Sequence, residues 1–215
     1  MTPHSAISPF GATALGVRLQ RPMCQACLRA QSTCICALAV PTTHSTDVLI
    51  LQHPLEVHHA KNTARLLHLS LPGSRLVVGE AFNDMQLQTL LPCGNYAVLL
   101  YPPTPHCVPT QLDAARLPPT APATQITLVV LDATWRKSRK MLHLSPALQR
   151  LPRLGLENLP PSAYAIRKAH APGQLSTLEA TCTALAQLEG DAAKFAPLLS
   201  AFKAFVALRA SHLPK

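Results

Sequence analysis

The feature that most constrains this chain is an unbroken apolar segment that stops at a carboxylate, residues 126–132 with the sequence ITLVVLD. Six bulky or β-branched residues in a row are typical of a strand that is buried on both faces, as in a parallel sheet. Ligands of open α/β sheets bind at the carboxyl ends of such strands. After this end the chain carries Asp132, Thr134 and its only tryptophan, Trp135, and then a basic segment. We therefore expect a site there for a cationic or aromatic group beside a polyanion.

Short apolar segments alternate with segments of helical periodicity along the chain. The pattern predicts strands and helices in turn, with strands over 47–53, 75–79, 96–101 and 126–132 and helices over 55–69, 135–143, 176–188 and 195–208. A short strand is predicted over 164–167, a loop or insertion over 102–124, and mostly turns over 146–161, which holds four prolines. The alternation favours an α/β fold with a mostly parallel sheet flanked by helices.

The composition favours a polyanionic partner. Nineteen Lys and Arg residues against ten Asp and Glu give a net charge of +9, which suits nucleic acid, although a basic protein without such a partner has the same balance. Aromatic residues make up only 4 %, so the base-stacking surface of an RNA-recognition motif is not expected. No apolar run approaches the roughly 20 residues of a membrane span, and we expect no membrane partner.

The first 18 residues lack the basic start and sustained apolar core of a secretory signal. We therefore expect a cytoplasmic protein with a flexible N-terminal tail over 1–20. The next segment, 21–40, would bind a metal, and 41–215 would form the α/β domain. A chain of 215 residues is long enough for such a domain with a small appendage.

Four of the seven cysteines lie close together, as Cys24-x-x-Cys27 and Cys34-x-Cys36. Four thiolates complete a closed tetrahedral zinc site, and residues i and i+2 of an extended segment face the same side. The spacing predicts a structural zinc site that stabilises a small segment and does no chemistry. Free thiols, redox use and an iron–sulfur cluster are the alternatives.

Three familiar motifs are missing. The chain has no GxGxxG, no GxxxxGK[ST] and no GxSxG. A dinucleotide-binding Rossmann domain, a P-loop NTPase and a nucleophile-elbow hydrolase are therefore not expected.

Each segment that carries polar chemistry has two interpretations. Asp132 is either the cap of the next helix or a general base, and Trp135 is either core or the wall of a base-binding pocket. Ser176 and Glu179 fit the capping box S/T-x-x-E, yet a helix start also offers N–H groups to a carboxylate or phosphate.

Two further segments could bind a substrate. Polar residues at a strand end and on the next predicted helix either line a cleft or serve turn chemistry, namely Gln52, His53, Glu56, Asn62 and Thr63. A basic stripe is predicted on one helical face, and it is suited to phosphates unless it is only a solvated face. Its members are Arg136, Arg139 and Lys140, and Arg167 could extend it.

Taken together, five segments between residues 23 and 188 resemble the DTW-domain family of tRNA-uridine aminocarboxypropyltransferases. They read CQACLRAQSTCIC, QHPLEVHHAKNTARLL, LLYP, LDATWRKSRKML and YAIRKAHAPGQLSTLEA, in that order. The resemblance implies a SPOUT-like α/β fold whose C-terminal half can be knotted. It also implies transfer of the 3-amino-3-carboxypropyl group of S-adenosylmethionine to N3 of a tRNA uridine, with release of methylthioadenosine.

The resemblance also implies roles for individual residues. Asp132 becomes the general base, Trp135 stacks on adenine or shapes the donor pocket, and the basic stripe holds tRNA. Contacts with the S-adenosylmethionine donor are expected from the ends of the strands predicted over 96–101 and 126–132 and from the start of the helix near 176. The residues are Tyr101, Pro102, Asp132, Thr134, Trp135, Leu175, Ser176, Thr177 and Glu179. The sequence departs from the family pattern at Ala133, where glycine is common, after Pro102, and at His170, where proline is usual.

Two other functions share these features. An RNA methyltransferase of similar fold would use the same donor and release S-adenosylhomocysteine. A non-catalytic, zinc-containing RNA-binding protein would not need Asp132. The sequence carries no indication of the oligomeric state.

Overall fold

The strand predicted over 126–132 lies inside a six-stranded sheet in the computed structural model, which describes residues 21–102, 111–112, 125–156, 159, 162–164 and 174–211. The sheet has the order β2-β1-β5-β3-β6-β4, and every neighbouring pair is parallel. The strands are β1 (Asp47–Gln52), β2 (Arg75–Val78), β3 (Tyr96–Leu100), β4 (Gln111–Leu112), β5 (Ile126–Asp132) and β6 (Arg153–Leu154). The predicted parallel α/β sheet is confirmed.

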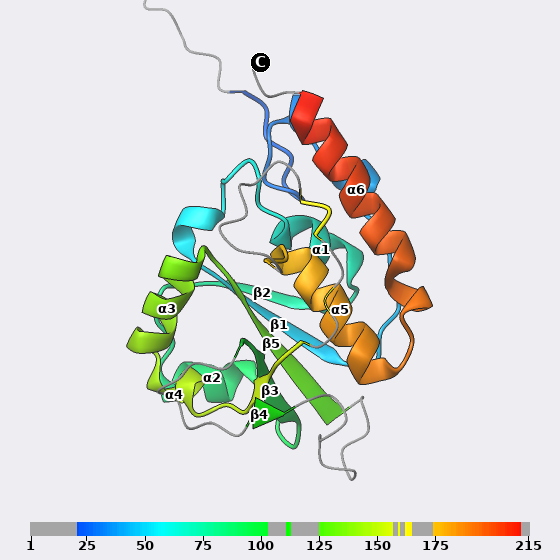
Figure 1. The fold of residues 1–215 in the computed structure, drawn as a ribbon. Coiled ribbons are helices and arrows are strands. Elements are labelled where there is room, and N and C mark those ends of the chain that lie inside the picture. Colours follow the sequence, from blue (N-terminus) through cyan, green and yellow to red (C-terminus); the bar gives the residue numbers. More distant parts are fainter. Residues whose placement is uncertain are drawn as a thin grey trace, which may run out of the picture.

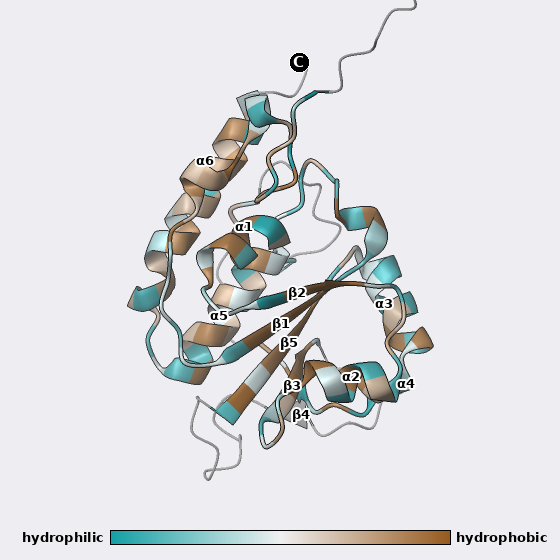
Figure 2. Cartoon of the chain, turned by 180° about the vertical axis from the view of Figure 1, so that it is seen from behind, coloured by the Kyte–Doolittle hydropathy of each residue, from teal (hydrophilic) through white to brown (hydrophobic). Residues whose placement is uncertain are grey.

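Helices cover both faces of the sheet, in two layers that Figure 1 shows. One layer contains α1 (Ala64–Ser70), α5 (Thr177–Glu189) and α6 (Ala196–Ser211), and the other contains α2 (Asp84–Leu90), α3 (Trp135–Leu144) and α4 (Pro146–Gln149). The apolar colouring of β1 and β5 in Figure 2 reflects this double burial. Alternate residues of a strand point to opposite faces, so Ile50 and Val130 pack in the first layer and Leu51 and Val129 in the second.

The helix predicted over 55–69 is wrong in its first half. Residues Pro54–Glu56 form a single 3-10 turn, an irregular segment follows, and α1 begins only at Ala64. The His53 ring accepts a hydrogen bond from the backbone N–H of Leu55, and side chains from elsewhere bind the carbonyls of residues 60–62. Such contacts compete with helical hydrogen bonds and override the local periodicity.

The segment predicted as turns over 146–161 is partly regular. It contains the short helix α4, which starts with Pro146, and the strand β6. Proline is favoured in the first helical turn because its missing N–H has no partner there in any case. Helix α2 was not predicted, although Asn83 and Gln86 form a capping box that marks its start in the sequence.

Some expectations fall outside the described residues. They concern the tail over 1–20, residues 165–167 of the predicted short strand, and most of the loop over 102–124. The knot also stays a prediction, because the connections that would form it include residues outside the described ranges. Among the described helices, none combines the length and the hydropathy needed to cross a membrane.

Candidate functional site

Asp132 stands at the carboxyl end of β5, where three side chains donate hydrogen bonds to its carboxylate. Gln52 Nε2 lies 2.8 Å and Asn62 Nδ2 2.5 Å from Oδ2, and the Thr177 hydroxyl lies 2.7 Å from Oδ1. Gln52 pairs with Asp132 in the parallel register of β1 and β5, so the two strands end side by side. Only 4 % of Asp132 is exposed. The carboxylate is therefore held rigidly by a neighbouring strand, the segment before α1, and the start of α5.

The environment of Asp132 favours its protonated form. Burial raises the pKa of this carboxyl above its ordinary value, while the hydrogen bonds from Gln52, Thr177 and Asn62 lower it and the charge of Glu56 raises it. Burial dominates, so the net direction is upward. A carboxylate with a raised pKa is a stronger base than one in water, which suits proton abstraction.

A cavity of about 510 Å³ opens beside Asp132. Its wall includes six of the residues predicted from the sequence, namely Glu56, Asn62, Thr63, Asp132, Thr134 and Thr177. It also includes five that are not among the predicted site residues, namely His59, Lys61, Ala133, Lys137 and Tyr164. The volume lies within the range of small-molecule sites.

Two ion pairs border this strand end. Lys137 Nζ lies 2.8 Å from Glu56 Oε1, so α3 is tied to the turn after β1. Lys140 Nζ lies 2.8 Å from Glu80 Oε1, and the buried His53 contacts the same carboxylate oxygen at 3.3 Å through Nε2. Lys140 lowers the pKa of Glu80 most, followed by His53. His53 thus contacts Glu80, and it is not part of the cavity wall.

The start of α5 forms the predicted capping box. Ser176 Oγ accepts from the N–H of Glu179, and the Glu179 carboxylate accepts from the N–H of Ser176. The same carboxylate also accepts hydrogen bonds from Ser162 and from the N–H of Ala163. Glu179 is buried and its oxygens are occupied, so it joins residues 162–164 to the helix that carries Thr177.

We expect Glu179→Ala to destabilise the fold by about 1–3 kcal/mol, because the N–H groups of Ser176 and Ala163 and the Ser162 hydroxyl lose their acceptor, although Ser176 still caps the helix. Gln86→Ala is a matched control, since Gln86 closes the capping box of α2 on the surface and should cost about 0.5 kcal/mol. Urea unfolding of both variants measures the difference. Equal free-energy losses would contradict the anchoring role of Glu179.

Trp135 and Tyr101 lie together, apart from the cavity wall. Their ring centroids are 5.8 Å apart in an edge-to-face arrangement, and Trp135 is 44 % exposed. The Tyr101 hydroxyl lies 3.3 Å from Ser138 Oγ, and the Arg153 guanidinium lies over the Tyr101 ring and donates to the Pro102 carbonyl. The residues predicted to contact the donor therefore fall into two groups, one around Asp132 and one around the rings of Tyr101 and Trp135. Another of them, Leu175, directly precedes Ser176, the N-cap of α5.

The basic stripe predicted on α3 is exposed. Arg136, Arg139 and Lys140 are accessible to solvent, whereas Lys137 on the same helix turns toward Glu56 and the cavity. Arg167, predicted to extend the stripe, lies outside the described residues.

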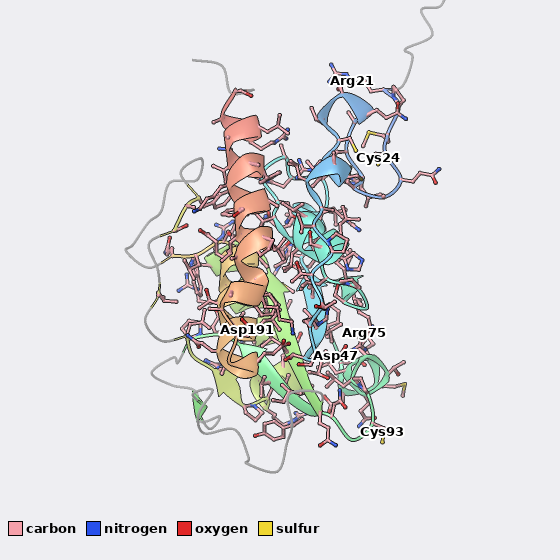
Figure 3. The ribbon with its side chains drawn as sticks, turned by 90° about the vertical axis from the view of Figure 1, so that its right-hand side faces the viewer. Arg21, Cys24, Asp47, Arg75, Cys93 and Asp191 are labelled. Carbon is pink, nitrogen blue, oxygen red and sulfur yellow. The ribbon has the colours of Figure 1, made fainter. Side chains whose placement is uncertain are left out.

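The four N-terminal cysteines meet in one cluster. Their sulfur atoms all lie within 4.8 Å of one another, with Cys24 to Cys36 and Cys27 to Cys34 each at 3.6 Å. A tetrahedral zinc ion with Zn–S bonds of about 2.3 Å needs sulfur atoms about 3.8 Å apart, so the cluster fits. Figure 3 shows the segment around Cys24 at one end of the molecule, beside α6.

The backbone around Cys24 is arranged to stabilise a thiolate. N–H groups of Cys27 and Ala26 donate to its sulfur and lower the pKa of Cys24 to about 6. Leu28 takes a left-handed conformation (φ 57°), which lets the chain turn back so that the N–H of Cys24 reaches the carbonyl of Arg29 at 2.7 Å. Burial, followed by the neighbouring thiols, raises the pKa of Cys36 to about 12. A bound cation would favour the thiolate form of all four.

Some residues at the site are missing from the sequence prediction, and others were predicted without their contacts. Gln52 belongs to the segment predicted to line a cleft, and its contact with Asp132 comes from the pairing of β1 with β5. Lys137 lies in the basic segment of α3, but its inward direction depends on Glu56. Tyr164 carries no signal in the sequence, since its place at the cavity depends on the packing of residues 162–164 against α5.

The chain resembles proteins of one family. It is 34 % identical over 178 residues to tRNA-uridine aminocarboxypropyltransferase 2 of Drosophila melanogaster, which covers 79 % of this chain and 68 % of the relative. With the protein of the same name from Mus musculus the identity is 31 % over 201 residues, which covers 90 % of this chain and 65 % of the relative. With tRNA-uridine aminocarboxypropyltransferase A of Arabidopsis thaliana the identity is 26 % over 232 residues, which covers 90 % of this chain and 83 % of the relative.

No solved structure matches the chain. The DTW domain, however, matches residues 21–210, a range that includes both the cysteine cluster and the strand end at Asp132. The chain belongs to the DTW domain family.

Proposed function

We propose that this protein is a tRNA-uridine aminocarboxypropyltransferase, which moves the 3-amino-3-carboxypropyl group of S-adenosylmethionine to N3 of a tRNA uridine. The observation that carries the proposal is the buried carboxylate of Asp132, held by three donors beside a cavity of about 510 Å³. The names of the relatives from fly, mouse and Arabidopsis support the substrate class.

The chemistry requires a base. The N3–H of uridine is a weak acid, and Asp132 would take its proton. Among the described residues, Oδ1 accepts one hydrogen bond, from Thr177, which leaves a lone pair for the proton. The N3 anion then attacks the carbon next to the sulfonium. The N–C bond forms as the C–S bond breaks, and the electron pair stays on sulfur in the departing methylthioadenosine. The proton remains on Asp132 until solvent removes it.

The residues at the cavity fit a cationic, nucleoside-bearing donor. Its wall includes the carboxylates of Asp132 and Glu56, which favour a sulfonium in the ground state. Tyr164 offers an aromatic ring, and Thr134 and Thr177 offer hydroxyl groups. Catalysis would depend mainly on positioning, since ordinary methyl transfer uses the same donor.

The deciding experiment is mass spectrometry of tRNA nucleosides after incubation of tRNA with the purified protein and S-adenosylmethionine. An added aminocarboxypropyl group, with methylthioadenosine released, supports the proposal. An added methyl group with S-adenosylhomocysteine would identify a methyltransferase. Binding of tRNA without any product would identify a non-catalytic RNA-binding protein.

The exposed stripe of α3 is proposed to bind the tRNA backbone. We expect Arg139→Ala to weaken tRNA binding and to reduce the slope of log K against log salt by about one unit, because one phosphate contact is lost. Lys203→Ala is the control, since Lys203 is an exposed cation on α6. Filter binding at several salt concentrations measures both slopes. An unchanged slope for Arg139→Ala would remove the stripe from the interface.

We also propose that zinc occupies the cysteine cluster as a structural ion. Cys24, Cys27, Cys34 and Cys36 would hold it with all four positions filled, so that the ion orders the segment and takes no part in the transfer.

A further inference from the structure

The irregular segment before α1 is held by side chains from distant parts of the chain. Arg29, in the cysteine segment, donates from Nη1 to the Ala60 carbonyl at 2.7 Å and from Nη2 to the Asn62 carbonyl at 3.0 Å. Its two nitrogens thus bind the carbonyls on either side of Lys61. We call residues 60–62 the Asn62 turn.

Two more donors complete this arrangement. Arg209 of α6 donates from Nε to the same Ala60 carbonyl at 3.0 Å, and the Tyr164 hydroxyl donates to the Lys61 carbonyl. All three carbonyls of the turn therefore bind side chains rather than helical N–H groups. Because the backbone bonds of this turn are made by side chains, its conformation depends on those side chains.

Burial of the Arg29 guanidinium disfavours its charged form. Burial lowers the pKa of this group most, and the charge of Arg209 lowers the pKa further. The guanidinium also lies 5.4 Å from the ring centroid of Phe205 in α6. Its two fork hydrogen bonds and this ring contact offset the desolvation.

The Asn62 turn leads directly to the carboxylate. Asn62 Nδ2 donates to Asp132 Oδ2 at 2.5 Å, while Asn62 Oδ1 accepts from the N–H of Arg65 at 3.3 Å and from Gln52 Nε2 at 3.4 Å. The amide is thereby oriented with its donor toward Asp132.

We propose that Arg29 is a positioning residue of the transfer reaction, which fixes the Asn62 turn and through it the hydrogen bond that Asn62 donates to Asp132. The inference rests on the proposed function. It also connects the cysteine segment to the site without giving the metal any chemical part. Lysine cannot replace Arg29 fully, because an ammonium lacks the fork that binds two carbonyls at once.

The expected signature is a change in pH dependence. The hydrogen bond from Asn62 lowers the pKa of Asp132, so its loss moves that pKa further upward. In the part of the chain that the structure describes, the charged and titratable groups around Asp132 are Glu56, paired with Lys137 of α3, and His59, Lys61 and Tyr164 at the cavity. Gln52 and Thr177 are neutral donors. Replacing Arg29 removes none of these side chains.

The test compares Arg29→Ala and Arg29→Lys with Arg21→Ala, which removes an exposed cation from the same segment (Figure 3). For Arg29→Ala we expect kcat to fall about tenfold. The acid limb of kcat/KM should move upward by about half to one pH unit. Arg29→Lys should be intermediate, and Arg21→Ala should match the unaltered protein. Asn62→Ala should show the same shift, and the double variant should add nothing to it.

A second measurement is independent of activity. In ¹⁵N-correlated NMR spectra of the zinc-loaded protein, the side-chain amide signal of Asn62 should move in Arg29→Ala and Arg29→Lys but not in Arg21→Ala. An unmoved amide signal, an unchanged acid limb, or shifts that add in the double variant would each overturn the inference. If the unaltered protein makes no product, the proposed function fails, and the NMR measurement still decides whether Arg29 fixes Asn62.

Discussion

Asp132→Asn should abolish aminocarboxypropyl transfer, with product formation reduced by about 10²–10⁴-fold, the usual contribution of a general base. The substitution keeps the shape of the side chain. Its amide oxygen can still accept from Asn62 and Gln52, and its NH₂ group can donate to the Thr177 hydroxyl in place of the bond that Thr177 now donates. The loss would therefore reflect the missing proton acceptor rather than a collapsed site.

The stability and the activity of the protein should depend on pH in opposite directions. Because the pKa of Asp132 is raised in the folded protein, the contribution of Asp132 to the free energy of unfolding falls as the pH increases from the ordinary carboxyl range through the raised pKa. At neutral pH the buried charge destabilises the protein, so Asp132→Asn should keep or increase the melting temperature. Activity has the opposite dependence, since the base must be ionised, and it should fall below the raised pKa.

Asp191→Asn is the matched control, since Asp191 is an exposed carboxylate just after α5 (Figure 3). Product formation is measured by nucleoside mass spectrometry and stability by thermal unfolding. If Asp132→Asn modifies tRNA at the rate of the unaltered protein, Asp132 is not the base.

Cys34→Ser should abolish binding of the zinc proposed for the cysteine cluster and lower the melting temperature by on the order of 10 °C. Three thiolates bind zinc less tightly than four. Ile35 follows Cys34 in the chain, and the sulfur of Cys27 lies 3.6 Å from that of Cys34. Both Cys27 and Ile35 are buried in the same apolar cluster as Phe202 and Phe205 of α6. Loss of the metal would therefore loosen the packing of α6 as well as the segment itself.

Cys93→Ser is the control, because Cys93 is an exposed cysteine far from the cluster (Figure 3). Metal content by plasma mass spectrometry should be about one zinc per chain in the control and close to none in Cys34→Ser. Unchanged metal content and melting temperature in Cys34→Ser would contradict a structural zinc site.

The strands and the later helices could be predicted because local pattern and tertiary environment agree. The segment over 126–132 is apolar throughout because both of its faces are covered, and β5 has the predicted bounds. The capping box of Ser176 and Glu179 likewise marks the start of α5. Where donors from distant segments bind the backbone, as at the Asn62 turn, local periodicity predicts a helix that does not form.

The position of the candidate site follows from the sequence, but its contacts do not. Asp132 ends the apolar segment that forms β5, and Gln52, at the neighbouring strand end, belongs to the segment predicted to line a cleft. The bond from Asn62 depends on the path of an irregular segment, and the bond from Thr177 on how α5 packs against the sheet. Neither follows from spacing along the chain.

The shared carbonyl of Ala60 has a consequence for fragment design. Arg29, close to the cysteines, and Arg209, near the end of α6, both donate to this one oxygen, so the first and last described segments close on the same peptide group. A truncated protein that starts at residue 41 would lose the hydrogen bond from Arg29, and one that stops before Arg209 would lose the bond from Arg209. Both would keep every strand of the sheet. Shortened versions made for crystallisation should therefore retain 21–211, and fusion partners should be joined outside that range.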